Sequence, residues 1–425
     1  MNFDRMRALL LDQAIRGELV PQLAEEGVVE IGAIAPEAFK LPKTWKWLTL
    51  KSLVIPTKQI IPEESFTYLD VSSIKNFQID EIKRLDPSNA PSRARKVVQP
   101  GMVLFATVRP YLKNICVSPE LPGQVIASTA FATMTCSKDL NNRYLFYFLR
   151  SDFFTDLVKS KQRGISYPAI SEKDFYAFPV PVPPLDEQIR IVAKLDDAFA
   201  EIDRAEKAYE ELQTLAGVLR GQILQEAIQG KLVPQLVSDG VTKQIAEAPE
   251  EVPFDIPNTW SWIRGEELAV KRKTIDPSTL TNDEIELWSI PAYDAGVAEK
   301  VSPGDIRSSK KVVQAGDVLL AKIVPHIERV WIVSESANSL MKLASTEWLV
   351  YASELFLPEF MGLLFRSPYF RTKMMESVSG MGSLKRANPR TLAKVWLPVP
   401  PIKEQERIVI KVETLLKQVN LLLTK

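Results

Sequence analysis

Residues 184–230 have the sequence PLDEQIRIVAKLDDAFAEIDRAEKAYEELQTLAGVLRGQILQEAIQG, and this stretch decides the fold of the chain. Its apolar residues recur at spacings of three and four with polar residues between them, at Val192, Leu195, Phe199, Ile202, Tyr209, Leu212, Ala216, Leu219 and Ile223. This spacing predicts a long helix whose apolar seam needs a partner helix. At 1.5 Å rise per residue, about 45 residues span on the order of 65 Å.

The sequence on either side of this helix is an internal duplication. Matching segments keep a nearly constant offset of 213 to 217 residues. The clearest pairs are LLDQAIRGELVPQ (Leu10–Gln22) with ILQEAIQGKLVPQ (Ile223–Gln235), LPKTWKW (Leu41–Trp47) with IPNTWSW (Ile256–Trp262), KVVQPGMVLFATVRP (Lys96–Pro110) with KVVQAGDVLLAKIVP (Lys311–Pro325), and PVPPLDEQIRIV (Pro181–Val192) with PVPPIKEQERIV (Pro398–Val409). A fixed offset over most of the chain indicates a two-fold repeat.

The repeat is circularly permuted. The second helix copy reaches only Lys425, and its seam residues Val412 and Leu416 match Leu195 and Phe199. The missing part of that copy resembles residues 1–16, in which Phe3, Met6 and Leu10 align with Ala216, Leu219 and Ile223. We therefore expect the two terminal helices to cover the central seam together, with the termini close to each other. The alternative is that each helix packs only on its own domain.

The fold class that we predict is α+β, with two similar domains joined by long helices. Short β-rich runs after turn residues, such as VVQPGMVLFATV, and helical periodicity at 141–159 and 357–377 favour a mixed, mostly antiparallel sheet in each domain. Trp45, Trp47, Trp260 and Trp262 are expected to be core anchors. The predicted parts are an N-terminal helix at 1–16, a first domain at 17–183, the central helix at 184–230, a second domain at 231–400 and a C-terminal helix at 401–425.

Composition excludes several classes of function. The chain has 46% apolar residues, 53 Lys and Arg against 53 Asp and Glu, and two cysteines, Cys116 and Cys136, which we expect to be reduced. It lacks a stretch of 18 apolar residues and a recognisable targeting segment, so we expect a cytosolic protein. His326 is the one histidine, and phosphate-binding loops, catalytic triads and metal-ligand spacings are all missing from the sequence. We therefore expect no catalytic centre, no metal and no cofactor.

Charge is distributed unevenly along this neutral chain. Residues 41–185 have 19 Lys and Arg against 12 Asp and Glu, and residues 256–400 have 18 against 16. Residues 181–230 have 5 against 10, so the central helix is acidic. Basic domains on an acidic helix suit binding to nucleic-acid phosphates, although an acidic helix is also an ordinary solvated surface.

Basic and polar clusters occupy matching places in both halves but differ in sequence. They precede and follow the KVVQ strand, and they recur in a loop before each PVPP copy, at 161–167 and 382–388. Arg, Asn and Ser are side chains that contact base edges in the major groove, and aromatic rings contact thymine methyl groups. The candidate DNA-binding residues are Arg93, Arg95, Lys96, Arg109, Tyr111, Lys113, Arg163, Ser166 and Tyr167 in the first half, and Lys310, Lys322, His326, Arg329, Lys385, Arg386, Asn388 and Arg390 in the second.

The combination of three motifs resembles the specificity subunit of a type I restriction-modification system. These are the tryptophan entries at Leu41 and Ile256, the PVPP–EQ helix starts at Pro181 and Pro398, and the AIxGxLVPQ segments at Ala14 and Ala227. The resemblance covers nearly the whole chain. It implies that each domain is a target recognition domain for one half of a bipartite, asymmetric double-stranded DNA site. It also implies that the helices form an antiparallel coiled coil, set the spacing of the half-sites and dock two methyltransferase subunits, with restriction subunits added in the full complex.

Two other classes remain open from the residues alone. A coiled-coil adaptor could also place two similar domains on a helix, but it would not need Arg and Lys in its divergent loops. The recognition portion of a fused DNA methyltransferase or nuclease would need catalytic motifs, which this sequence does not contain. Neighbouring genes for a methyltransferase and a helicase-nuclease would favour the specificity subunit.

Overall fold

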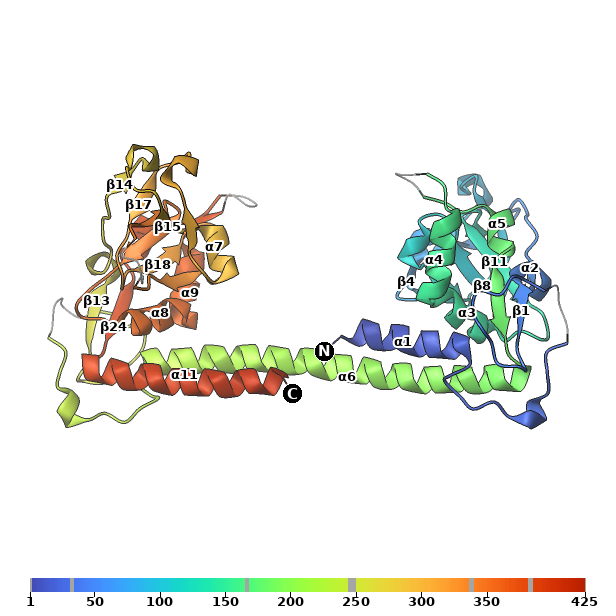
Figure 1. Cartoon of the computed structure of the whole chain (residues 1–425), viewed down its shortest axis with the longest axis horizontal. Coiled ribbons are helices and arrows are strands. Elements are labelled where there is room, and N and C mark those ends of the chain that lie inside the picture. The colour runs from blue at the N-terminus through green and yellow to red at the C-terminus, as the bar shows by residue number, and fades with distance from the viewer. Residues whose placement is uncertain are drawn as a thin grey trace. The chain divides into compact units, whose positions relative to one another are not determined.

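The computed structural model describes residues 2–30, 34–164, 168–243, 250–335, 340–380 and 385–424. The chain divides into two compact units, unit 1 (Met1–Tyr209) and unit 2 (Glu210–Lys425). Helix α6 (Leu185–Ile228) is continuous over 44 residues, so its first part belongs to unit 1 and its last part to unit 2 (Figure 1). The long central helix is therefore confirmed.

Unit 1 is built from two four-stranded sheets with helices packed on one side. The strand orders are β6-β3-β10-β7 and β2-β11-β8-β9, and β10 pairs with β3 in parallel while the other pairs are antiparallel. Two small sheets, β1-β12 and β4-β5, complete the unit. The elements are α1 (Phe3–Arg16), β1 (Lys46–Thr49), α2 (Leu50–Leu53), β2 (Val54–Pro56), β3 (Phe66–Leu69), β4 (Ile74–Lys75), β5 (Gln78–Ile79), β6 (Lys83–Leu85), β7 (Ala94–Val98), β8 (Val103–Ala106), β9 (Ile115–Val117), β10 (Gln124–Ser128), β11 (Phe131–Cys136), α3 (Asn142–Arg150), α4 (Asp152–Lys161), α5 (Glu172–Tyr176) and β12 (Pro179–Val182).

Unit 2 repeats this plan with a few changes. Its sheets have the orders β14-β17-β20-β15-β16 and β19-β18-β21, with β15 and β20 parallel, and β13-β24 corresponds to β1-β12. The elements are β13 (Ser261–Arg264), β14 (Thr274–Ile275), β15 (Ile285–Trp288), α7 (Ile290–Ala295), β16 (Glu299–Val301), β17 (Lys310–Val312), β18 (Val318–Ala321), β19 (Val330–Ile332), β20 (Lys342–Ser345), β21 (Trp348–Tyr351), α8 (Pro358–Arg366), α9 (Pro368–Glu376), β22 (Val378–Ser379), β23 (Arg386–Ala387), α10 (Pro389–Leu392), β24 (Trp396–Val399) and α11 (Ile402–Thr424). The predicted α+β class with mixed, mostly antiparallel sheets is confirmed.

Each unit contains one antiparallel helix pair. In unit 1, α1 lies along α6, where the Phe3 and Tyr209 rings are 6.1 Å apart and Arg7 pairs with Asp203 at 2.6 Å. In unit 2, α11 lies along the end of α6, where Arg220 donates to Asn420. Arg7 and Arg220 are equivalent in the repeat, as are Asp203 and Asn420, so equivalent residues join the two helices in both units. The permuted repeat seen in the sequence is therefore a structural repeat as well.

The apolar seam differs from the prediction in one place. Leu219 is 40% exposed, and Met6, which aligns with it in the repeat, is 44% exposed. The end of α6 buries Leu224 and Ala227 instead, beside the predicted Ile223. A straight helix has 3.6 residues per turn, so a seam spaced at 3.5 drifts around its surface by about 20° per seven residues. The covered face therefore turns toward the domain.

The Glu-Gln pair after each PVPP segment fastens domain to helix. In unit 1 the buried Glu187 accepts from the Trp45 indole N–H at 3.0 Å and from the Gln22 amide at 3.0 Å. Gln188, also buried, accepts from the backbone N–H of Asn141 at 2.8 Å and donates to the Asp139 carbonyl at 3.0 Å. Burial raises the pKa of Glu187. These two side chains thus connect the start of α6 to the N-terminal part of the unit and to the segment before α3.

Unit 2 uses the same arrangement. Glu404 accepts from the Trp260 indole N–H at 3.0 Å and from Gln235, and burial raises its pKa as well. Gln405 accepts from the backbone N–H of Leu357 at 2.8 Å. The prediction that the paired tryptophans are core anchors is confirmed, because Trp45, Trp47, Trp260 and Trp262 are all buried.

Candidate nucleic-acid interface

Two loops that are far apart in the sequence meet at one end of the sheets in unit 1. Loop A (residues 107–114) follows β8, and loop B (residues 163–170) follows α4. The Arg109 N–H donates to the Pro168 carbonyl at 2.7 Å, and the Ile170 N–H donates to the Thr107 carbonyl at 2.9 Å. Arg163 and Ala169, at the two ends of loop B, exchange both backbone hydrogen bonds, at 2.8 and 2.9 Å. The candidates Ser166 and Tyr167 lie outside the described residues.

Unit 2 has the same two loops in the same register. Here loop A is residues 322–329 and loop B is residues 380–387. The Val324 N–H donates to the Lys385 carbonyl at 3.1 Å, and the Ala387 N–H donates to the Lys322 carbonyl at 2.8 Å. These residues are equivalent to the bonded pairs of unit 1, at offsets of 215 and 217 residues. The structure thus brings the two predicted basic loops together in each unit.

Loop A begins in a strained backbone conformation in both units. Arg109 has φ of 47° and its equivalent Val324 has φ of 49°, which is the left-handed region that non-glycine residues rarely adopt. Such a conformation costs of order 1–3 kcal/mol and persists where the surroundings determine it, here through the hydrogen bond to loop B. Both units therefore hold this position of loop A in the same backbone conformation despite different side chains.

The turn before β11 joins the same end of unit 1. The Thr129 N–H donates to the Arg93 carbonyl at 2.8 Å, and the Thr107 N–H donates to the Ala130 carbonyl at 2.8 Å. Arg93 is exposed, and its Nε lies 3.2 Å from the Tyr68 hydroxyl. The segment before β7, the turn before β11, loop A and loop B therefore form one continuous edge.

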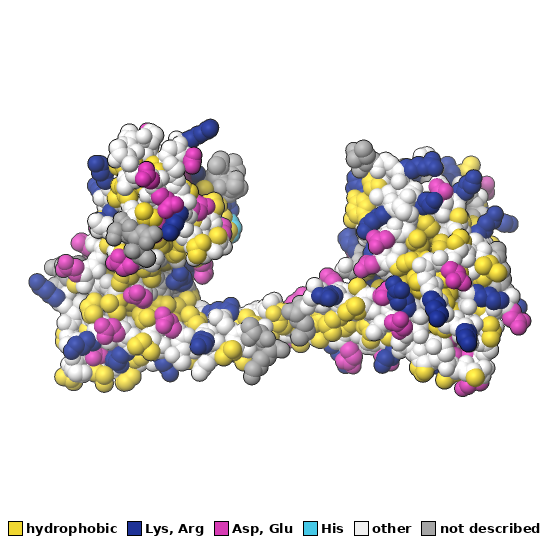
Figure 2. All heavy atoms as spheres, viewed as in Figure 1, with side chains coloured by type: hydrophobic (Ala, Val, Ile, Leu, Met, Phe, Trp, Pro, Cys, Tyr) yellow, Lys and Arg dark blue, Asp and Glu magenta, His cyan; other side chains and the backbone are white. Residues whose placement is uncertain are grey.

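Most of the candidate side chains are exposed or half-buried. Figure 2 shows Lys and Arg side chains over the end of unit 1 that lies away from α6, among other basic groups elsewhere on the same face. The exposed candidates are Arg93, Tyr111, Arg163, His326, Lys385, Asn388 and Arg390, and the half-buried ones are Arg95, Arg109, Lys113, Lys322, Arg329 and Arg386.

Several candidates have protein partners. Lys113 donates to the Arg150 carbonyl at 3.0 Å and pairs with Asp152 at 2.9 Å. Arg329 forms a two-pronged pair with Asp294, at 2.9 and 3.0 Å. Asn388 caps α10, because its side-chain oxygen accepts from the Arg390 N–H. Arg95 donates to the Ala94 carbonyl at 2.8 Å. Lys322 and Arg386 both pair with Glu347.

Two of the predicted contact residues are buried, and the structure contradicts them as surface contacts. Lys96 is 3% exposed, and its ammonium donates to the Phe131 carbonyl at 2.6 Å and pairs with Glu172. Lys310 is 9% exposed and donates to the Ser308 carbonyl at 2.9 Å, and burial lowers its pKa. In β7 alternate residues are buried, so Lys96 lies on the inner face of the strand and its ammonium binds backbone oxygen within the protein.

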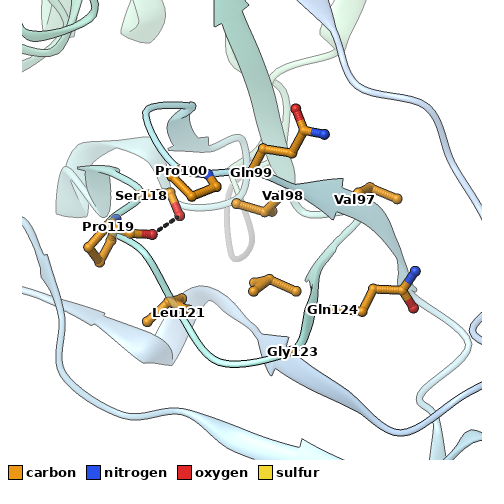
Figure 3. Close-up of a pocket in the computed structure, with 10 residues that line it drawn as sticks. Val97, Val98, Gln99, Pro100, Ser118, Pro119, Leu121, Gly123 and Gln124 are labelled. Atoms are coloured by element: carbon orange, nitrogen blue, oxygen red, sulfur yellow. Dashed lines mark hydrogen bonds between the residues drawn. The ribbon is translucent and has the colours of Figure 1, made fainter.

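The described residues form neither a metal site nor a reactive-thiol site. They contain no cluster of His, Cys, Asp and Glu able to hold a metal ion. Cys116 and Cys136 are free thiols, and burial raises the pKa of each to about 12, so neither is an activated nucleophile. The hollow in Figure 3, about 260 Å³ beyond the other end of β7, is lined by Val, Pro, Leu, Gln, Ser and Gly, and Ser118 donates to the Pro119 carbonyl there at 3.2 Å. An ionisable group for acid–base chemistry is missing from this lining.

The comparisons with known proteins first define a class. Residues 118–214 match the family model described as the type I restriction modification DNA specificity domain. That segment contains β11, α3, loop B and the first part of α6, which is much of what shapes the edge in unit 1. Residues 118–214 are therefore similar to the DNA specificity domain of type I restriction-modification systems.

Relatives extend this similarity over the whole chain. The type I restriction enzyme EcoKI specificity subunit of Escherichia coli strain K12 is 22% identical over 414 residues, which cover 90% of this chain and 86% of that protein. The EcoBI specificity subunit of Escherichia coli is 25% identical over 323 residues, and the matched segment covers 72% of this chain but 66% of that subunit, just under two thirds.

Solved structures agree with these relatives. The crystal structure of the HsdS subunit from Thermoanaerobacter tengcongensis is 28% identical, with a TM-score of 0.59 over 91% of this chain and 92% of that one. A chain from a study of complex assembly and conformational transition in the type I R-M system is 28% identical with a TM-score of 0.70, over 91% of this chain and 93% of that one. This chain is thus similar to type I restriction-modification specificity subunits in sequence and in fold.

Proposed function

We propose that this chain is the non-catalytic DNA-recognition subunit of a type I restriction-modification complex. Each unit reads one half of a bipartite, asymmetric double-stranded DNA site. The observation that carries this proposal is the repeated edge, in which the backbone hydrogen bonds between loop A and loop B are the same in both units while the side chains differ. A constant frame with variable side chains is what two readers of different sequences require.

The side chains of the edge suit contacts to DNA. Unit 1 presents Arg93, Arg109, Tyr111 and Arg163, and unit 2 presents His326, Lys385, Arg390 and the half-buried Arg386. Arginine contacts guanine with two hydrogen bonds in the major groove, and lysine and arginine neutralise phosphates. We retain these residues as the proposed contacts, together with Lys113, Lys322, Arg329 and Asn388 as partly engaged ones, and we omit Lys96 and Lys310.

The helices have a second proposed role. The long helix α6, with its partners α1 and α11, sets the spacing between the half-sites and docks two methyltransferase subunits, to which restriction subunits are added. The acidic excess of residues 181–230, 10 Asp and Glu against 5 Lys and Arg, supports a protein-facing rather than a DNA-facing surface. The domain limits given above from the sequence remain our proposal for the two recognition domains.

The remaining parts of the proposal concern place and chemistry. The catalytic groups and their cofactors belong to the partner subunits, and the complex acts in the cytoplasm, where chromosomal DNA lies. Among the described helices, none combines the length and apolar character needed to cross a membrane.

Methylome sequencing tests the function directly. Cells that express the methyltransferase subunits with or without this chain are compared. The proposal predicts a split methylation motif that requires this chain. Methylation that is unchanged without the chain, or a motif with one continuous block, would contradict it.

A further inference from the structure

The turn between β20 and β21 in unit 2 places a carboxylate between two cations of the DNA-facing edge. Glu347 accepts from Nε and from a terminal nitrogen of Arg386, at 3.1 and 3.2 Å, and one of its oxygens lies 3.9 Å from the Lys322 ammonium. Arg386 belongs to loop B and Lys322 to loop A. Three segments that are distant in the sequence thus supply one ionic triad.

Unit 1 has the same frame without the charges. The positions equivalent to Lys322, Glu347 and Arg386 are Thr107, Ala130 and Ala169, at offsets of 215, 217 and 217 residues. The Thr107 N–H donates to the Ala130 carbonyl at 2.8 Å, as the Lys322 N–H donates to the Glu347 carbonyl at 3.0 Å. The backbone therefore does not need the triad, since unit 1 builds the same edge with a hydroxyl and two methyl groups.

The triad contributes little to the folding stability of unit 2. The side chains of Lys322, Glu347 and Arg386 are 26%, 26% and 40% exposed, and ion pairs that solvent reaches contribute little to folding. What the two-pronged contact does supply is orientation, because it fixes the plane of the guanidinium group. A feature that adds little stability, faces the proposed DNA surface and is found in one unit points to specificity.

A third cation lies beside the triad. Lys311 donates to the Trp348 carbonyl at 2.6 Å, just as its equivalent Lys96 donates to the Phe131 carbonyl. Burial, and then the charge of Lys322, lower the pKa of Lys311, while Glu347 acts in the opposite direction. Glu347 thus balances positive charge that phosphate groups would otherwise attract without regard to sequence.

We infer that Glu347 is a positioning residue for DNA specificity in unit 2, which holds Arg386 for a two-pronged contact to a guanine of its half-site. The inference rests on the proposed function. Guanine presents N7 and O6 side by side in the major groove, and an oriented arginine fork matches this pair. Glu347 has a second effect in the same place, since its negative charge weakens contacts that involve phosphates alone.

The test compares methylomes of complexes assembled with the methyltransferase subunits. The variants are Glu347→Gln, Glu347→Asp and Arg386→Lys, with Glu354→Gln as the matched control. Glu354 is an exposed acid beyond the other end of β21, so its replacement removes the same charge from unit 2 outside the triad. The half-site of unit 1 is an internal control in every complex.

The inference predicts that Glu347→Gln and Arg386→Lys relax the same base pair, a guanine position in one half-site, on the order of 10-fold or more. Glu347→Asp keeps most of this preference, and Glu354→Gln has the wild-type motif. The complex with Glu347→Gln also binds unrelated DNA more tightly. The slope of its log K against log salt concentration is steeper by about one.

Three results would overturn the inference. The first is an unchanged motif in Glu347→Gln, and the second is relaxation spread evenly over both half-sites. The third is a fall in thermal stability with equal loss of methylation at all sites, which would mark a merely structural role. If the wild-type complex itself directs no split motif, the proposed function fails, and this outcome is separate from failure of the inference alone.

Discussion

Units 1 and 2 share the main-chain contacts of the edge and differ in the side chains that they place on it. Arg109 and Val324 adopt the same strained conformation and make the same hydrogen bond to loop B, yet one is a long cation and the other a short apolar side chain. Lys96 and Lys311 are held by equivalent carbonyl groups. The comparison teaches that the frame of the edge is set by main-chain contacts, which leaves the outward side chains of each unit to vary independently.

Away from the edge, the two units differ in how they hold an equivalent arginine. Arg150 in unit 1 lies among aromatic rings, 3.7 Å from the centre of Phe77, and burial lowers its pKa to about 10. Its buried Nε has no hydrogen-bond partner among the described residues. The equivalent Arg366 in unit 2 instead donates to the Val330 carbonyl at 2.6 Å. Phe77 comes from the β4–β5 hairpin, and α7 occupies the corresponding part of the sequence in unit 2.

The largest effect is expected from a change between the two units. Insertion of four residues, about one helical turn, after Glu211 adds roughly 6 Å to α6. The pairing of α1 with the first part of α6, and of α11 with its last part, is kept. We expect methylation at the original sites to disappear and to reappear at sites with a longer gap and unchanged half-sites. Methylome sequencing of the variant measures both. A changed half-site with the original gap would contradict the spacing role of α6.

The next prediction tests whether the tryptophan–glutamate hydrogen bond between domain and helix contributes equally to stability in the two units. Trp45→Phe and Trp260→Phe each remove an indole N–H from a buried carboxylate, which costs about 1–3 kcal/mol. We expect similar losses of stability in the two variants by chemical denaturation. Trp47→Phe is the control, because it removes a hydrogen bond to the neutral Phe39 carbonyl, and its loss should be smaller. A large loss in one unit only would break the comparison.

A pH dependence follows from the same carboxylates. Burial raises the folded-state pKa of Glu187 and Glu404 above the ordinary value of 4.5. Each group therefore contributes stability below pH 4.5 and loses that contribution as the pH rises through the folded-state pKa. The stability of wild type relative to Glu187→Gln should fall over this range, and Glu404→Gln should behave in the same way. Unfolding free energies measured from pH 4 upward test this, and a flat difference would contradict it.

The smallest effect concerns backbone strain. Val324→Gly relieves a β-branched residue of its left-handed conformation but adds freedom to the unfolded chain. We expect a net gain in stability of at most about 1 kcal/mol, and less for Arg109→Gly, because a side chain without a β-branch is less strained there. Thermal unfolding distinguishes the two. A clear loss of stability in Val324→Gly would mean that the conformation is not strained.

Much of the fold could be predicted from the sequence because its determinants are periodic or repeated. The seam from Val192 to Ile202, the paired tryptophans and the matching offsets each report a local pattern. The exposure of Leu219 and Met6 could not be foreseen, since seam spacing does not show how far the covered face of a helix turns toward an adjacent domain. That depends on packing over long range.

The candidate site was predictable in position but not in detail. The basic loops around Arg109 and Arg163, and around His326 and Arg386, were found because they recur at one offset. The sequence did not show which cations face solvent, because a cluster such as RARK does not reveal that its lysine lies on the buried face of a strand. Glu347 was missed because a search for cations passes over a carboxylate. The sequence did contain a signal for this residue, because the position equivalent to Glu347 in the first half of the repeat is Ala130, which has no charge.

The central claim is that each unit reads its own half-site through loops A and B. It is tested most directly by the methylomes of Arg163→Ala and Arg386→Ala beside that of wild type. The account predicts that each variant relaxes one half-site, a different one in each case, by about 1–3 kcal/mol of base discrimination, and leaves the other half-site intact. Uniform weakening at all sites, or relaxation of the same half-site by both variants, would contradict it.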